Sequence, residues 1–286
     1  MINAPLTHDT RDFNGIYLHV VYAGDPEAEP LILLHGFPEF WYAWRNQIDA
    51  LVNAGFRLIM PDMRGYNLSA KPDGVEDYNL DVLADDVIAL MDSTGREKVT
   101  IIGHDWGGAI AWHTANKFPE RVKKLVVLNV PHNAIFAKSL RESVSQKLKC
   151  WYMGFFQLEG IPEKVTGLGN WSVMAWWAFS GSAGFTSDVL AQYRQAWSQP
   201  GAMTAMMNYY RAVRRARPKP LPSQRIDDMP VLLIWGKRDR VFSNDLAQAS
   251  IDLCQHGQVG YIENGTHWVQ NDSPDAVNAC LLNFLA

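Results

Sequence analysis

Short apolar runs typical of buried β-strands alternate with segments of helical apolar spacing through the first half of the chain. Such alternation is typical of parallel strands joined by crossover helices. We predict strands at 16–23, 31–35, 56–61, 99–103 and 124–130, and helices at about 41–54, 81–93 and 107–118. The sequence therefore predicts an α/β protein with a doubly wound, mostly parallel sheet.

The alternation stops at Pro131, and a comparable strand reappears only at 231–235, followed by a predicted helix near 244–254 and a strand near 258–263. The residues between are rich in Trp and Met and contain few strand-like runs. We expect a helical cap formed by 135–225, inserted into a core formed by 1–134 and 226–286. A cap of this kind would cover an active site.

Composition disfavours several kinds of partner. A chain of 286 residues with 48% hydrophobic residues can build one large core with an inserted lobe. The net charge of -4 and the pI near 6.1 give no overall attraction to nucleic acid or to an anionic membrane. No apolar stretch approaches the length of a membrane span, and the N-terminus lacks the features of a signal peptide. We expect a cytoplasmic protein that is a monomer or a homodimer.

The three cysteines, Cys150, Cys254 and Cys280, are widely separated and lack the short paired spacing of a zinc site or a disulfide framework. We expect them to be buried small apolar residues.

The segment Gly103-His104-Asp105-Trp106-Gly107-Gly108 lies where a predicted buried strand gives way to a helix. This is the form of a nucleophile elbow, whose tight turn needs small residues two positions before and after a strained central residue. The central residue is Asp105, and an aspartate with an ordinary pKa of about 3.9 is ionised at neutral pH without a base. We predict that Asp105 attacks an electrophilic carbon. The competing interpretation is a structural turn in which Asp105 caps the following helix.

Two further residues complete a triad in the chain order nucleophile, acid, histidine that this elbow uses. Asp239 follows the predicted strand at 231–235, and His267 follows the next strand. Both loops leave the carboxyl ends of strands, where open α/β sheets place their sites. We predict that Asp239 orients His267, which activates water as a base. His104 neighbours Asp105, but we expect it to have a packing role.

The tetrapeptide His35-Gly36-Phe37-Pro38 ends the early strand at 31–35. Gly36 and Pro38 restrain a loop that can present the Phe37 N–H toward the elbow, with the Trp106 N–H as a second donor. We predict that Phe37 and Trp106 form an oxyanion hole. No metal, nucleotide or organic cofactor is required by this chemistry.

At this point the chain resembles the epoxide hydrolases of the α/β-hydrolase type, from about Asn14 to the C-terminus. The motifs that carry the resemblance are HGFPEFWYAWR (35–45), DMRGYNLSAKP (62–72), GHDWGG (103–108), NVPH (129–132) and WGKRD (235–239). The resemblance implies an α/β-hydrolase fold and conversion of an epoxide to a vicinal diol through an alkyl ester on Asp105. An apolar pocket would suit a small hydrophobic epoxide.

In that family two cap tyrosines bind and protonate the epoxide oxygen. Met207-Asn208-Tyr209-Tyr210-Arg211 resembles the family's Asn-aromatic-Tyr-Arg segment, which implies Tyr210, with Tyr209 as the alternative. The segment 151–157 resembles the one that holds the other tyrosine, which implies Tyr152. A protonated tyrosine can stabilise the alkoxide that develops as the ring opens. We expect contacts with the substrate from Phe37, Pro38, Trp106, Tyr152 and Tyr210.

Two other functions stay open. A haloalkane dehalogenase would share the aspartate, the histidine and the tryptophan after the nucleophile, but it often uses an Asn after His-Gly to hold the halide, and here Phe37 stands there. A ligand-binding protein on a retired hydrolase fold is favoured by an incomplete triad, whereas every catalytic position is filled here.

Two features of the cap receive structural interpretations. We predict that a basic cluster is the solvated end of a cap helix rather than a nucleic-acid site; its members are Arg211, Arg214, Arg215, Arg217 and Lys219. We predict that an aromatic stretch is mainly the core of the cap, with one or two side chains lining the pocket; its members are Trp171, Trp176, Trp177 and Phe179.

Overall fold

The computed structural model describes residues 2–215 and 225–286, and its centre is an eight-stranded sheet in the order β1-β2-β4-β3-β5-β6-β7-β8. The strands are β1 (Leu6–Phe13), β2 (Ile16–Ala23), β3 (Glu29–Leu34), β4 (Phe56–Pro61), β5 (Val99–His104), β6 (Val122–Leu128), β7 (Ile226–Gly236) and β8 (Cys254–Ile262). β2 pairs in antiparallel fashion with β1 and with β4, and the other neighbouring strands are parallel. The predicted doubly wound, mostly parallel α/β sheet is confirmed.

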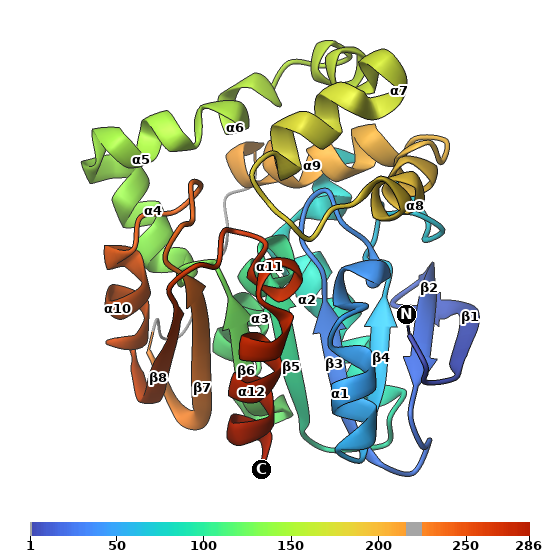
Figure 1. The fold of residues 1–286 in the computed structure, drawn as a ribbon, viewed down its shortest axis with the longest axis vertical. Coiled ribbons are helices and arrows are strands. Elements are labelled where there is room, and N and C mark those ends of the chain that lie inside the picture. Colours follow the sequence, from blue (N-terminus) through green and yellow to red (C-terminus); the bar gives the residue numbers. More distant parts are fainter. Residues whose placement is uncertain (1, 216–224) are drawn as a thin grey trace.

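Helices cover both faces of this sheet (Figure 1). One face carries α1 (Ile48–Asn53) and α12 (Pro274–Leu285). The other carries α2 (Leu80–Asp92), α3 (Trp106–Lys117) and α10 (Asp245–Ile251). The short helix α11 (Val269–Asp272) precedes α12, and 3-10 turns occur at Trp41–Trp44, Val75–Tyr78 and Pro119–Arg121.

Strand β3 is buried on both faces of the sheet, and this is why the central strands could be predicted from the sequence. Leu31 and Leu33 pack in the cluster that includes α1 and α12, whereas Ile32 and Leu34 pack in the cluster on the opposite face. A parallel strand that is buried on both faces needs apolar residues at every position, so it reads as a continuous apolar run.

The chain between β6 and β7 forms α4 (Asn133–Glu142), α5 (Val144–Lys149), α6 (Trp151–Phe155), α7 (Ile161–Phe179), α8 (Ser187–Trp197) and α9 (Ala202–Arg215). Figure 1 shows α5 to α9 across the end of the sheet to which the parallel strands point. These helices occupy the segment predicted to be a helical cap, and the loops after β5, β7 and β8 emerge beneath them. No helix among the described residues is long and apolar enough to span a membrane.

Several elements differ from the expectation. β1 and α12 were not predicted, and the predicted helix at 41–54 is divided into the 3-10 turn Trp41–Trp44 and the separate helix α1. Trp44 is fully buried, and the Gln47 side chain donates to the Gln270 carbonyl. Tertiary contacts of this kind override a local helical pattern.

Candidate active site

Asp105 lies in a strained turn between β5 and α3. Its φ of 48° and ψ of -119° are unusual for a residue other than glycine. The turn is tight, because a Cβ at Gly103 would lie 2.4 Å from the Gly107 carbonyl oxygen, and a Cβ at Gly107 would lie 2.1 Å from the Leu34 carbonyl oxygen. The Asp105 side chain makes no hydrogen bond that caps α3, so the interpretation of Asp105 as a helix cap is wrong.

The Asp105 carboxylate contacts two of the predicted site residues. The Phe37 N–H donates to Oδ1 at 2.8 Å, and His267 Nε2 lies 3.4 Å from Oδ2. The two carboxylate oxygens therefore have different partners. All three residues are buried.

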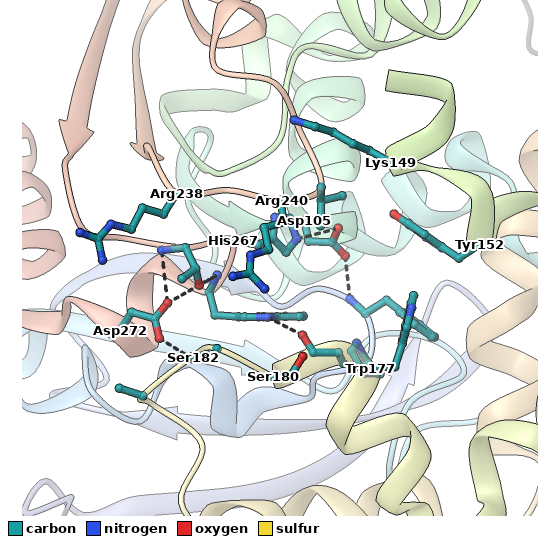
Figure 2. Close-up of a pocket in the computed structure, with 18 of the residues that line it drawn as sticks. Asp105, Lys149, Tyr152, Trp177, Ser180, Ser182, Arg238, Arg240, His267 and Asp272 are labelled. Atoms are coloured by element: carbon teal, nitrogen blue, oxygen red, sulfur yellow. Dashed lines mark hydrogen bonds and ion pairs between the residues drawn. The ribbon is translucent and has the colours of Figure 1, made fainter. Parts of the chain in front are cut away.

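Asp239 holds the other side of the His267 ring. His267 Nδ1 lies 2.9 Å from Asp239 Oδ2 (Figure 2 shows His267 beside Asp105). Asp239 Oδ1 accepts hydrogen bonds from the Val241 and Phe242 N–H groups at 2.6 and 2.9 Å. A carboxylate with these donors is fixed in orientation, and it fixes the tautomer and orientation of the ring that it contacts.

The charges of the two carboxylates set the ionisation of His267. Burial lowers the pKa of His267, but the charge of Asp239, the hydrogen bonds with Asp105 and Asp239, and the charge of Asp105 outweigh burial and raise this pKa to about 10. Burial likewise raises the pKa of Asp105, but the hydrogen bond and charge of His267, with smaller contributions from His104 and the Phe37 N–H, outweigh it and lower the pKa. At neutral pH the site therefore holds an ionised Asp105 beside a protonated His267.

Tyr152 and Tyr210 line the same cavity as Asp105 and His267, and its volume is about 520 Å³. The two phenol rings lie edge to face with their centroids 5.8 Å apart. Burial raises the pKa of each phenol well above its ordinary value; a coulombic interaction with Cys150 adds to this for Tyr152, and one with Tyr152 adds to it for Tyr210. Both phenols are therefore protonated at neutral pH and can act as hydrogen-bond donors.

Of the other three residues predicted to contact the substrate, two line the cavity and one does not. Phe37 and Pro38 line the cavity, whereas Trp106 is not among its lining residues. The Trp106 ring packs edge to face on Tyr210 at a centroid distance of 5.1 Å. The role of the Trp106 backbone N–H as a second donor in the oxyanion hole stays a prediction. No group of three or more His, Cys, Asp or Glu side chains that could hold a metal ion occurs in the described part of the chain.

A comparison with known proteins agrees with this geometry. A family model described as alpha/beta hydrolase fold matches residues 29–274. The chain is 43% identical over 274 residues to AB hydrolase superfamily protein YfhM of Bacillus subtilis, which covers 95% of each chain. It is 35% identical to Epoxide hydrolase 4 of Homo sapiens, over 95% of this chain and 76% of that protein. The chain belongs to the α/β-hydrolase-fold epoxide hydrolase family.

The likeness to epoxide hydrolases is also seen in the three-dimensional structure. A crystal structure of a Bacillus megaterium epoxide hydrolase in complex with an inhibitor matches 97% of this chain and 99% of that one, with a TM-score of 0.88 and 32% identity. The predicted resemblance is therefore confirmed at the level of family and fold.

Sequence reasoning missed a buried polar network behind the histidine. His104 Nδ1 lies 2.8 Å from Glu39 Oε2, and His104 Nε2 lies 2.8 Å from the His267 carbonyl oxygen. Both nitrogens of the His104 ring therefore lie within hydrogen-bonding distance of an oxygen, one from Glu39 and one from the backbone of His267. Glu39 also accepts a hydrogen bond from the Tyr193 hydroxyl of α8 at 3.1 Å, so the network joins the core to the helices above it. The position of Glu39 directly after the HGFP segment was the available signal.

Asn129 is a second residue that the sequence analysis did not single out. It follows β6 with a φ of 48°, and its side-chain Nδ2 donates to Asp239 Oδ2 at 2.7 Å. Its Oδ1 accepts a hydrogen bond from the Gly236 N–H at 2.9 Å. Asn129 therefore positions both Asp239 and the end of β7, where the loop that carries Asp239 begins.

Two expectations for the cap were wrong in part. Arg211 is not solvated: it is buried and pairs with Glu163 at 2.8 Å, whereas Arg214 and Arg215 are exposed as expected, and Arg217 and Lys219 lie outside the described residues. Trp176 is not part of the cap core, because 72% of it is exposed. Trp177 does line the cavity.

Proposed function

We propose that this chain hydrolyses an epoxide to a vicinal diol through a covalent ester on Asp105. The observation that carries the proposal is the ionised carboxylate of Asp105 in the same cavity as two buried, protonated tyrosines. A carboxylate is a nucleophile that needs no base, and the phenols supply the protons that an epoxide oxygen requires.

In the first step Asp105 Oδ2 forms a bond to one epoxide carbon while the bond from that carbon to the ring oxygen breaks. Oδ1 is held by the Phe37 N–H, which supports Oδ2 as the attacking atom. Tyr152 and Tyr210 donate hydrogen bonds to the ring oxygen, and one of them transfers its proton to the alkoxide. The product is a hydroxyalkyl ester of Asp105 with a tyrosinate beside it.

In the second step His267 accepts a proton from water, and the hydroxide attacks the carbonyl carbon of the ester. Esterification removes the Asp105 charge that helps to raise the pKa of His267, so this pKa falls. The protonated ring then gives its proton to the tyrosinate through solvent, and the neutral ring is able to act as the base. The oxyanion on Oδ1 accepts hydrogen bonds from the N–H groups of Phe37 and Trp106. Collapse breaks the ester bond, and His267 returns its proton to the leaving diol. The carboxylic acid of Asp105 then gives its proton to His267, which restores the ionised Asp105 beside the protonated ring.

The arrangement favours an oxygen leaving group over a halide. A halide leaving group needs hydrogen-bond donors but does not need a proton. An alkoxide is stabilised by hydrogen-bond donors and also by the transfer of a proton. The two protonated phenols of the cavity can provide both. The cap boundaries at 135 and 225, the cytoplasmic location and the monomeric or homodimeric state stay predictions.

Intact-protein mass spectrometry on His267→Gln tests the reaction class, because this variant should form the ester but fail to hydrolyse it. The variant is exposed to styrene oxide and, separately, to 1-bromobutane. We expect a mass gain equal to the whole epoxide, and no gain when Asp105 is also replaced by Ala. A gain equal to the butyl group with none from the epoxide would identify a dehalogenase instead. No adduct from either compound would contradict the covalent mechanism.

A further inference from the structure

A pair of histidines lies at the edge of the sheet where β1 pairs with β2, and neither is among the residues that line the cavity (Figure 1). His8 on β1 is exposed, whereas His19 on β2 is buried. His8 Nδ1 lies 3.0 Å from His19 Nε2. The ring centroids are 5.2 Å apart and the ring planes differ by 29°, so the two rings meet at these nitrogens. The reaction proposed above does not use this pair.

The buried carboxylate of Asp62 fixes the orientation of the His19 ring. His19 Nδ1 lies 2.7 Å from Asp62 Oδ2, which also accepts a hydrogen bond from the Asn67 side chain at 2.8 Å. Asp62 Oδ1 accepts a hydrogen bond from the Trp41 N–H at 3.1 Å. An ionised carboxylate only accepts hydrogen bonds, so Nδ1 of His19 carries the proton in this contact. In the neutral ring Nε2 then directs its lone pair toward His8.

His8 is the partner whose proton can change position. Burial and the charge of His19 lower the pKa of His8, although Asp62 acts in the opposite direction. The ring is therefore neutral at pH 7, and its single proton can lie on Nδ1 or on Nε2. With the proton on Nδ1, His8 donates a hydrogen bond to His19. With the proton on Nε2, two nitrogen lone pairs face each other, an arrangement that is favourable only when a cation binds to both.

The distance between the two nitrogens suits a shared metal ion. Two nitrogens bound to one ion at about 2.0–2.1 Å are separated by about 2.8–3.4 Å when the angle at the metal lies between about 90° and 110°. The observed separation is 3.0 Å. A histidine that binds a metal usually donates its other N–H to a carboxylate, and Asp62 occupies that position for His19. We propose that His8 and His19 bind a divalent transition metal ion, with Asp62 as a positioning residue.

The ligands determine which ions fit. Imidazole nitrogens suit Cu²⁺, Ni²⁺ and Zn²⁺, whereas Mg²⁺ and Ca²⁺ prefer oxygen ligands. The pair supplies two protein ligands, so water completes the coordination, and the exposure of His8 leaves the site open to solvent. His8 keeps its proton on Nε2 when Nδ1 binds the metal, so binding at neutral pH requires no loss of a proton from the neutral pair.

A bound ion would join the edge strand to the rest of the sheet. Among the described strands β1 pairs only with β2, and the ion would add a link between their side chains. An ion that binds the folded state in preference to the unfolded state stabilises the protein. Metal binding is therefore expected to raise the melting temperature.

Calorimetric titration of the untagged chain with Zn²⁺ tests the site. We expect binding to wild type, and binding weaker by about ten-fold or more for His8→Ala and for His19→Asn. The asparagine keeps an N–H for Asp62 but lacks a counterpart of Nε2. His256→Ala is the matched control, because His256 is an exposed histidine on β8, at the opposite edge of the sheet. Mg²⁺ should show no binding that depends on His8.

Two further measurements identify the ligands and the effect on the fold. The electron paramagnetic resonance spectrum of bound Cu²⁺ should indicate two imidazole nitrogens in wild type and in His256→Ala, but fewer in His8→Ala. Zn²⁺ should raise the melting temperature of wild type more than that of His8→Ala. His8 is exposed, so circular dichroism should show that His8→Ala is folded. Absence of Zn²⁺ binding to wild type, or equal Zn²⁺ affinities of wild type and His8→Ala, would overturn the site.

Discussion

Tyr209 and Tyr210 are adjacent on α9 but serve different surroundings. The Tyr209 hydroxyl donates to the Arg64 carbonyl oxygen at 2.7 Å, whereas Tyr210 lines the cavity. Adjacent residues on an α-helix differ by about 100° in direction, so only one of the two can face the cavity. Composition and spacing could not decide between them. The choice of Tyr210 came from the resemblance of the surrounding segment, and its role in ring opening stays a prediction.

The two cavity tyrosines give the first prediction at this scale. Tyr152→Phe and Tyr210→Phe should each slow formation of the Asp105 ester by about 100- to 1000-fold, since each removes a donor aimed at the developing oxyanion. Quenched mass spectrometry in the His267→Gln background measures this rate. Tyr209→Phe is the control, because its hydroxyl contacts a backbone carbonyl outside the cavity. A slow Tyr209→Phe beside a fast Tyr210→Phe would reverse the assignment.

At the scale of elements, β1 illustrates what an apolar pattern cannot reveal. Its sequence LTHDTRDF is largely polar, and most of its residues are exposed or half-buried. It lies at the edge of the sheet and pairs with β2 alone. Charged residues on an edge strand limit pairing with other molecules, so such a strand need not contain an apolar run. By contrast, β5 is buried at every position and was predicted within one residue of its observed end.

Arg211 connects the helix of Tyr210 to the segment that follows the helix of Tyr152. Its Nε donates to the Phe156 carbonyl at 2.9 Å, and its Nη2 donates to the Leu158 carbonyl and to Glu163. This explains why a residue that resembled part of a solvated basic cluster is buried: it satisfies backbone carbonyls at the ends of neighbouring elements. The contacts come from residues 48 to 55 positions away, so local charge patterning could not indicate them.

Removal of this guanidinium gives the prediction at the element scale. Arg211→Ala should lower the free energy of unfolding by about 3–5 kcal/mol, because it leaves buried acceptors without a donor. Arg211→Lys should lower the free energy of unfolding by less, since lysine keeps the charge although it lacks the planar guanidinium group. Urea unfolding measures both. Arg214→Ala is the matched control on the exposed side of α9 and should change stability by less than about 0.5 kcal/mol. An equal cost for Arg211→Ala and Arg214→Ala would refute the role given to Arg211.

At the scale of the whole molecule, the order of strands in the sheet assembles the site. β5, β6, β7 and β8 are consecutive neighbours, so the loops that carry Asp105, Asn129, Asp239 and His267 emerge along one edge. This assembly could be predicted, because parallel strands end on the same side of a sheet. The Glu39–His104–His267 network could not, since Glu39 lies 65 residues from His104 and His104 lies 163 residues from His267. Contacts of that kind depend on packing rather than on any local spacing.

The charges of Asp105, Asp239 and His267 make the free energy of unfolding decrease as the pH rises into the alkaline range. The pKa of His267 is raised on folding from 6.5 to about 10. A group whose pKa rises on folding stabilises the folded state fully below its unfolded pKa, and this contribution is lost as the pH rises through the folded value. The lowered pKa of Asp105 acts in the opposite direction, so its contribution is lost only in acid.

We therefore predict that the free energy of unfolding falls between pH about 7 and pH about 10, with a contribution from His267 on the order of 3 kcal/mol. Lysines and tyrosines also titrate toward the upper end of this window, so the comparison is made with His267→Gln, which lacks the group but keeps a side chain of similar reach. Urea unfolding at several pH values should show a smaller loss for this variant than for wild type. Asp105→Asn should lie between them, because the ring then keeps Asp239 but loses one carboxylate partner. Parallel curves for wild type and His267→Gln would mean that His267 is not protonated in the folded protein at neutral pH.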